Sequence, residues 1–244
     1  MNELLNKINQ LFAQGQSTEF EIRLLEKEAQ MFLSSSTTAA EGYMALGLLA
    51  AIRLDEKGVD DYFSKSLHLL PNDPLVLSNY AKVQHAIGHS GAALALIERT
   101  MKLMHHEVLT SQGVHVALSA LHIQQALDWQ NELEKPILSI PETWLSAHLQ
   151  LLACLNVAPA ALTQYRDKIA SVLVGKGFLV DRGWVSFRSN GGLDYTFMIK
   201  GNAIFDLSAI YADWESLVDE VLCQVVIFEA RLSTDATDTD SQTT

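Results

Sequence analysis

The chain has 244 residues, enough for one large or two small domains. Its apolar fraction of 48% and charged fraction of 19% indicate a chain that buries a core, and they exclude disorder of the whole chain. It has 17 Lys and Arg residues against 29 Asp and Glu residues, a formal net charge of −12. This acidity argues against binding to duplex DNA and against docking on an anionic membrane.

The two ends and the cysteines predict a cytoplasmic protein. The first seven residues have no basic region, so no signal peptide is expected, and apolar runs such as residues 45–52 are much shorter than the roughly 20 residues of a membrane helix. Cys154 and Cys223 lie in apolar helical contexts and are expected to be buried, reduced thiols. Residues 233–244 are Ser, Thr, Asp and Gln with almost nothing to bury, which predicts a disordered acidic tail.

The first two thirds of the chain are expected to be helical. Pro and Gly are sparse there, and apolar residues recur at helical spacing. One stripe runs within residues 4–12. A second helix is expected from Phe20 to Leu33, and the Ser17–Thr18 pair is a capping signal at its start.

A repeat begins at Tyr43. The chain there has an aromatic residue and a Leu-Gly pair on one predicted helix, an aromatic residue on the next, and a closing Pro: Tyr43, Leu46, Gly47, Ala50, Val59, Phe63, Ser66 and Pro71. This segment resembles the tetratricopeptide repeat, whose small residues let helices approach closely while bulky ones fill the gaps.

The pattern recurs more weakly 34 residues later. Its places are taken by Leu77, Tyr80, Ala81, Gln84, Gly88, Ala93, Ile97 and Thr100, with His105 in place of the closing Pro. Residues 110–138 and 143–174 are expected to add two degenerate helical pairs. The prediction is a tetratricopeptide-like array over residues 1–172, and a plain helical bundle is the alternative.

The last third changes character and predicts a small α+β domain over residues 173–232. Short strands are expected at 178–180 and 184–188, and Asn190-Gly191-Gly192 is a hairpin turn signal. The return strand is expected from Leu193 to Lys200, with Leu193, Tyr195, Phe197 and Ile199 on its apolar face. A final helix is expected over residues 213–232, with Asp213 at its start. A homodimer through the apolar stripe of this helix is a further hypothesis.

Candidate chemistry is sparse. His85 and His89 have a helical metal-ligand spacing, but the predicted turn at Gly88 separates them and no further ligand lies nearby, so no metal is expected. No nucleophile or phosphate-binding motif occurs, so no cofactor is expected and the chain is predicted not to be an enzyme. Between Arg166 and Lys200 there are six cations among aromatic residues, a weak indication of single-stranded nucleic acid that the apolar sheet face argues against.

The resemblance implies a protein-interaction module whose first helices line a concave groove. By that resemblance the groove positions are Glu41, Met44, Leu48, Ala51, Ser78, Lys82 and His85. Met44 and Leu48 make the first part apolar, which suits a partner peptide or amphipathic helix. They stand where some members of the family hold a carboxylate with polar residues, so no such clamp is expected.

Two other functional classes stay open. One is a regulatory or toxin-neutralising protein that acts through its C-terminal domain. The other is an enzyme with a site in that domain, for which Asp181, Arg182, Arg188 and Asp194 are the candidate polar residues.

Overall fold

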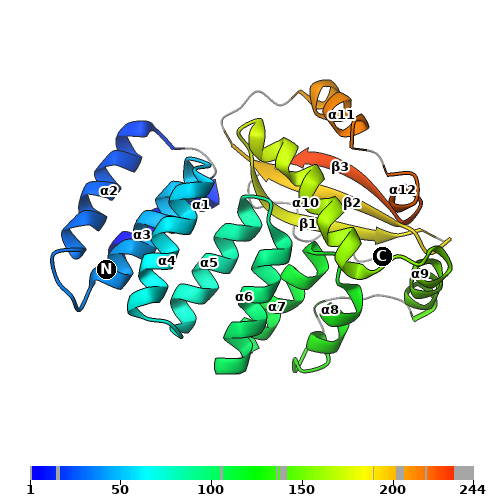
Figure 1. Ribbon diagram of the computed structural model, residues 1–244, viewed down its shortest axis with the longest axis horizontal. Coiled ribbons are helices and arrows are strands. Elements are labelled where there is room, and N and C mark those ends of the chain that lie inside the picture. Colours follow the sequence, from blue (N-terminus) through cyan, green and yellow to red (C-terminus); the bar gives the residue numbers. More distant parts are fainter. Residues whose placement is uncertain are drawn as a thin grey trace.

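The computed structural model is mainly α-helical, with a small mixed sheet near the C-terminal end (Figure 1). It describes residues 2–14, 17–104, 107–135, 137, 142–188, 190–201, 206–217 and 219–233. The helices before the sheet are α1 Asn2–Gln14, α2 Glu19–Phe32, α3 Ala39–Ile52, α4 Glu56–Leu69, α5 Pro74–Ala86, α6 Ser90–Leu103, α7 Glu107–Ser119, α8 Ile123–Gln130, α9 Glu142–Leu155 and α10 Pro159–Gly175. After them come β1 Leu179–Phe187, β2 Leu193–Lys200, α11 Leu207–Glu215, α12 Leu222–Val225 and β3 Val226–Leu232.

The turns inside the pairs α3–α4, α5–α6, α7–α8 and α9–α10 have the same backbone geometry. One residue per turn has a positive φ, and the next residue donates its N–H to a carbonyl five residues back, as in the Schellman motif. The positive-φ residues are Leu54, Gly88, Leu121 and Asn156, with φ values of 57°, 92°, 62° and 53°. The hydrogen bonds run from Asp55, His89, His122 and Val157 to Ala50, Gln84, Ala117 and Leu152, over 2.8 to 2.9 Å. These turns recur every 33 to 35 residues, so the expected series of paired helices is confirmed.

Packing inside the array follows the small and large residues of the pattern. A Cβ at Gly47 would lie 2.6 Å from the Phe63 ring, so only glycine lets α3 approach α4 this closely. Phe63 in turn stacks on Tyr80 of the next pair, with ring centroids 4.6 Å apart. Asp73 begins α5 by accepting the N–H groups of Leu75 and Val76 at 2.9 and 3.0 Å.

Helix α10 leaves the direction of the array. The chain bends by 93° between residues 143–155 and 159–175, although the turn between them has the repeated geometry. Pro159 occupies the first position of α10, where it lacks only an N–H that would be unsatisfied anyway. As a result α10 crosses the turn ends of α5–α8 and packs on one face of the sheet (Figure 1), while β1 contacts α5 and α7 directly.

The sheet has the strand order β1-β2-β3, with β1 antiparallel and β3 parallel to β2. The hairpin at Asn190-Gly191-Gly192 and the alternation of the return strand are as expected: Leu193, Tyr195, Phe197 and Ile199 are all fully buried. Gly183 is required in β1, because a Cβ there would lie 2.0 Å from the Tyr195 hydroxyl oxygen.

The prediction of one final helix over residues 213–232 is wrong. Helix α11 ends at Glu215, α12 is a single turn, and residues 226–232 form β3. Val226, Ile227 and Phe228 are β-branched or aromatic and favour a strand, and β2 supplies the hydrogen-bond partners that a local pattern cannot reveal. Asp213 does not begin a helix; Asp206 caps α11, and Asp213 pairs with Lys176 at 2.6 Å. The hypothesis of a homodimer depended on the apolar stripe of this helix, and residues 213–232 do not form one helix.

The core of the sheet is continuous with that of the last helices. Leu162, Ile169 and Leu173 of α10 share one buried cluster with the apolar face of β2. Trp214 of α11 belongs to the same cluster, and its Nε1 donates to the Ile169 carbonyl at 3.0 Å.

The thiols are less buried than expected: Cys154 is exposed and Cys223 is half-buried. No single described helix is long and apolar enough to cross a membrane; α9 and α10 meet the length and composition test only as a bent pair. Of the predicted tail, residues 233–244, Ser233 is placed in the structure and donates its N–H to the Ile199 carbonyl at 2.8 Å, and residues 234–244 lie outside the described part.

Candidate protein-interaction surfaces

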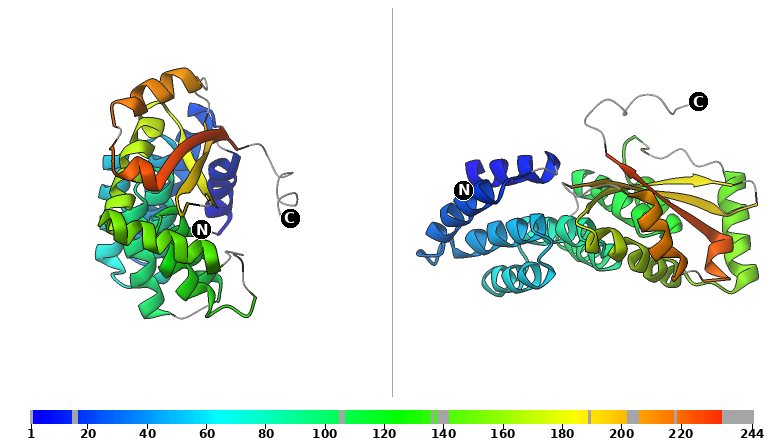
Figure 2. Two further views of the ribbon diagram at one scale, coloured as in Figure 1. Left: turned by 90° about the vertical axis from the view of Figure 1, so that its right-hand side faces the viewer. Right: turned by 90° about the horizontal axis from the view of Figure 1, so that it is seen from above.

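The inner face of the array, formed by α3, α5 and α7, is covered by other parts of the same chain. Figure 2 shows α1 and the strands on the same side of the paired helices. Helix α1 contacts α3, and β1 contacts both α5 and α7. The surface that the resemblance assigns to a partner is thus already in contact with α1 and the sheet.

Helix α1 covers the first part of the inner face through its apolar stripe. Leu4, Ile8 and Phe12 are buried and belong to one core cluster with Met44 and Leu48. The docked helix is also tied to α5. Lys82 donates from Nζ to the Asn9 side-chain oxygen at 2.9 Å and lies 5.0 Å from the centre of the Phe12 ring. Burial lowers the pKa of Lys82, and the positive charge of Lys200 adds to this effect.

The predicted groove residues are therefore placed on the inner face but do not form an open groove. Met44, Leu48 and Ala51 are fully buried core residues, while Glu41 is partly exposed. Ser78 is partly exposed and bonds across to the next pair. The structure brings Met44, Leu48, Ala51 and Lys82 together beneath or beside α1.

The two remaining groove positions bond within the array. Ser78 donates to the Gln112 side-chain oxygen at 2.9 Å, which links α5 to α7. His85 lies at the far end of α5, with its Nδ1 at 3.1 Å from the Ser90 hydroxyl. Burial and the positive charge of Arg166 lower the pKa of His85 to about 3, so this imidazole is neutral at pH 7.

A buried arginine fixes α10 against the array. Arg166 is fully buried, and its Nη1 donates to the Gly88 carbonyl at 2.8 Å and to Asp167 at 3.0 Å. Its guanidinium carbon lies 5.0 Å from the centre of the Phe197 ring and 5.7 Å from that of Tyr195. Burial by itself lowers the pKa of Arg166, but the interactions with Tyr195 and Asp167 have a larger combined effect, so the pKa is raised.

Polar groups around Arg166 join three parts of the fold. Asp167 accepts the N–H groups of Ser90 and Gly91 at 3.1 and 3.2 Å, at the start of α6. The Tyr195 hydroxyl donates to the Ser119 carbonyl at 3.1 Å. Each of these bonds connects the array to α10 or to β2, so the cluster is a structural junction. Its central residue, Arg166, gave no signal in the sequence that set it apart from Lys168, the other cation of the same helix.

The four polar residues considered for an enzyme site do not converge. Asp181 pairs with Lys200 at 2.9 Å near the start of β1, whereas Arg188 and Asp194 pair at 3.5 Å at the hairpin end. Arg182 lies 4.0 Å from Asp181. The strand between the two groups is about seven residues long, which is roughly 23 Å at a rise of about 3.3 Å per residue.

Histidines and acids do not gather into a ligand set within the described ranges. No group of three or more His, Cys, Asp or Glu side chains there could hold a metal ion. His85 and His89 turn to Ser90 and Gln84 respectively, so the predicted turn does separate them. His105 lies outside the described residues.

The edge of the array opposite α10 carries a repeated set of exposed apolar side chains. They stand at equivalent places where one helical pair ends and the next begins: Leu69 and Leu103, Leu70 and Met104, and Leu75 and Val108, with exposures between 41% and 68%. We call these six residues the loop edge. The ends of α4 and α6 and the starts of α5 and α7, where these residues occur, lie at the foot of the array in Figure 1.

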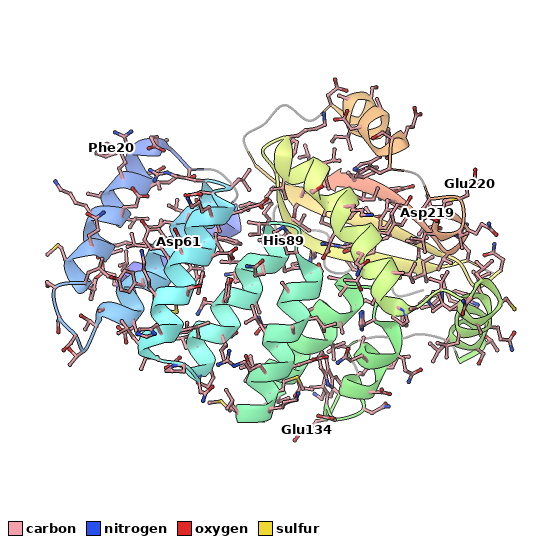
Figure 3. All side chains as sticks on the ribbon, in the orientation of Figure 1. Phe20, Asp61, His89, Glu134, Asp219 and Glu220 are labelled. Atoms are coloured by element: carbon pink, nitrogen blue, oxygen red, sulfur yellow. The ribbon has the colours of Figure 1, made fainter. Side chains whose placement is uncertain are left out.

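A shallow hollow adjoins the loop edge. Its volume is about 420 Å³, and it is lined by Tyr43, Asp61, Ser64, Lys65, His68 and Leu69. Asp61, labelled on α4 in Figure 3, is one of the charged residues of this lining. Lys65 lies one helical turn after Asp61 on α4, and its ammonium group is 5.8 Å from the centre of the Tyr43 ring. The edge therefore combines apolar side chains with a charged recess.

The fold and these surfaces define a helical-hairpin array that carries a three-stranded mixed sheet. Comparison of the chain with protein-family models, with curated proteins and with solved structures finds no match.

Proposed function

We propose that the protein is a non-enzymatic interaction module and that its loop edge binds the apolar face of an amphipathic helix or peptide of a partner protein. The observation that carries this proposal is the recurrence of exposed apolar residues at the same place in two successive helical pairs. Single exposed apolar residues are normal on protein surfaces, whereas an ordered row of them is typical of an interaction site.

The spacing of the edge suits a helical ligand. Each junction between successive helical pairs presents three apolar side chains, and neighbouring pairs pack about 10 Å apart. An α-helix rises about 5.4 Å per turn, so residues about two turns apart on a bound helix can contact both junctions. The adjoining hollow offers Asp61 and Lys65 to polar groups of the same ligand.

The inner face is a weaker candidate for this role. A ligand there must first displace α1, which would expose Leu4, Ile8 and Phe12 to water. Exposing three such side chains costs about 1.5–3 kcal/mol each. Binding at the loop edge requires no such rearrangement.

We further propose that the array is of the tetratricopeptide type. The 34-residue period, the Gly47–Phe63 contact and the closing Pro71 support this assignment. The later pairs keep the turn geometry while departing from the sequence pattern.

The test is affinity capture by the full purified chain from lysate of its own source cells. The edge variant is Leu69→Glu with Leu103→Glu, which places a charge at both equivalent positions. The matched control is Leu149→Glu, an apolar site on α9 with a comparable exposure of 40%.

The proposal expects one protein at near-stoichiometric yield with the wild-type and control chains, and its loss with the edge variant. Circular dichroism must show that all three chains are folded. Retention of that protein by the folded edge variant, or an empty capture by the wild-type chain, would refute the proposal.

A further inference from the structure

The first end of the array is closed by a helix whose outward side carries three exposed apolar residues among charged ones. Helix α2 packs on α3 through Ile22, Leu25 and Ala29. On the opposite side Phe20, Leu24 and Met31 are 76%, 58% and 73% exposed. Terminal helices of repeat arrays normally present a polar outer surface, so the three large apolar side chains on this one are an exception to that pattern.

The outward residues follow a coiled-coil spacing. Phe20, Leu24, Lys27 and Met31 are separated by four, three and four residues, which places them at successive d, a, d and a positions of a heptad. All four fall within about 60° around the helix at 100° per residue. Figure 1 shows α2 at the end of the array, and Figure 3 shows Phe20 at its outer margin.

The charges beside this stripe select an orientation. In the same heptad Glu21 and Glu28 take e positions, and Arg23 takes a g position. Two parallel helices pair g with e of the following heptad in the partner, which brings Arg23 to Glu28 of a second copy, twice by symmetry. Two antiparallel helices would instead oppose acidic e positions with each other.

The apolar spacing and the charges of α2 together favour one kind of binding partner for its outward face. We propose that the outward face of α2 binds the same face of a second copy of this chain, in parallel orientation, and forms an end-to-end dimer. Because α2 lies at the end of the array, the two arrays extend away from the contact. A two-fold axis parallel to α2 makes the interface self-complementary.

The contact is small, and the dimer is accordingly weak. Helix α2 has 14 residues and is about 21 Å long at 1.5 Å per residue. One pair of such helices buries less than the roughly 1,200 Å² of a standard stable interface. Lys27 at a core position lowers the affinity further and favours a defined register. We expect a dissociation constant in the micromolar range or above.

The test is sedimentation velocity of the full chain over a concentration series. The wild-type chain should shift from monomer to dimer as concentration rises. Leu24→Glu should abolish the shift. Leu75→Glu, a control at an exposed apolar residue of the loop edge, should leave it unchanged.

Charge reversal tests the orientation. Arg23→Glu and Glu28→Arg should each raise the dissociation constant about tenfold or more, and the double variant should restore it, because the pair is then reversed in both copies. A wild-type chain that stays monomeric up to millimolar concentration would overturn the proposal. So would a dimer that the folded Leu24→Glu variant retains, or a double variant that does not recover.

Discussion

Replacement of Arg166 by Ala tests how the array is joined to the sheet. The change removes the hydrogen bond to the Gly88 carbonyl, which is worth about 1.5–3 kcal/mol for a charged donor. It also removes the contacts with the Phe197 and Tyr195 rings, worth about 1–2 kcal/mol when desolvated. The buried charge disappears at the same time, and this relief of its desolvation offsets part of the loss. We expect the variant to lower the free energy of unfolding by about 3 kcal/mol. This value is at the lower end of the range of about 3–5 kcal/mol that is typical when one partner of a buried ion pair is removed.

Arg166→Met is the matched control, because it keeps the side-chain volume and removes the charge. We expect a loss of about 1 kcal/mol from this variant, since a buried ion can be replaced by an apolar side chain at little cost.

The assay is urea unfolding followed by two probes. Far-ultraviolet circular dichroism reports the helices. Fluorescence reports the four tryptophans, three of which, Trp144, Trp184 and Trp214, lie in or against the sheet domain. The two curves should coincide in the wild-type chain and separate in Arg166→Ala. A loss below about 0.5 kcal/mol for Arg166→Ala, the usual effect of a surface change, would refute the assigned role of this arginine.

Three further changes probe other contacts. Gly183→Ala should destabilise the sheet by about 1–3 kcal/mol, because its Cβ would overlap the Tyr195 hydroxyl, and Tyr195→Phe in the same chain should recover part of the loss; additive effects would contradict this reading. Ile8→Ala, at a fully buried position of α1, should cost about 2–5 kcal/mol, and a neutral result would mean that α1 is not part of the core. The third concerns pH. The pKa of His85 is lowered to about 3, so the unfolded chain takes up the proton first as pH falls below about 6.5, and folding stability decreases with acidification by up to about 1.4 kcal/mol per pH unit. His85→Gln should flatten the dependence of the unfolding free energy on pH between 6 and 4.5, and an unchanged slope would contradict the burial argument.

The array could be predicted because its determinants are local. The glycine at position 47, the aromatic residue at 63 and the Pro71–Pro74 linker act within one or two helical pairs, and the turn geometry repeats with them. The β1–β2 hairpin was equally predictable, since its turn and its alternating residues are adjacent in sequence.

Other features depend on contacts between distant segments. Residues 226–232 satisfy a helical pattern as well as a strand pattern, and only pairing with β2 decides between them. The amphipathic character of α1 was visible in the sequence, but not that its target is the inner face of the same chain. A tertiary contact of this kind turned Met44 and Leu48 from predicted groove residues into core residues.

The central claim is that α1 occupies the inner face and leaves the loop edge as the surface open to a partner. Hydrogen–deuterium exchange of the native chain, read on peptides from α1, tests it most directly. The amides of residues 5–12 should be protected to the same order as those of α3, because the two helices share one core. Rapid exchange of α1 beside a protected α3 would instead show an inner face open to a ligand.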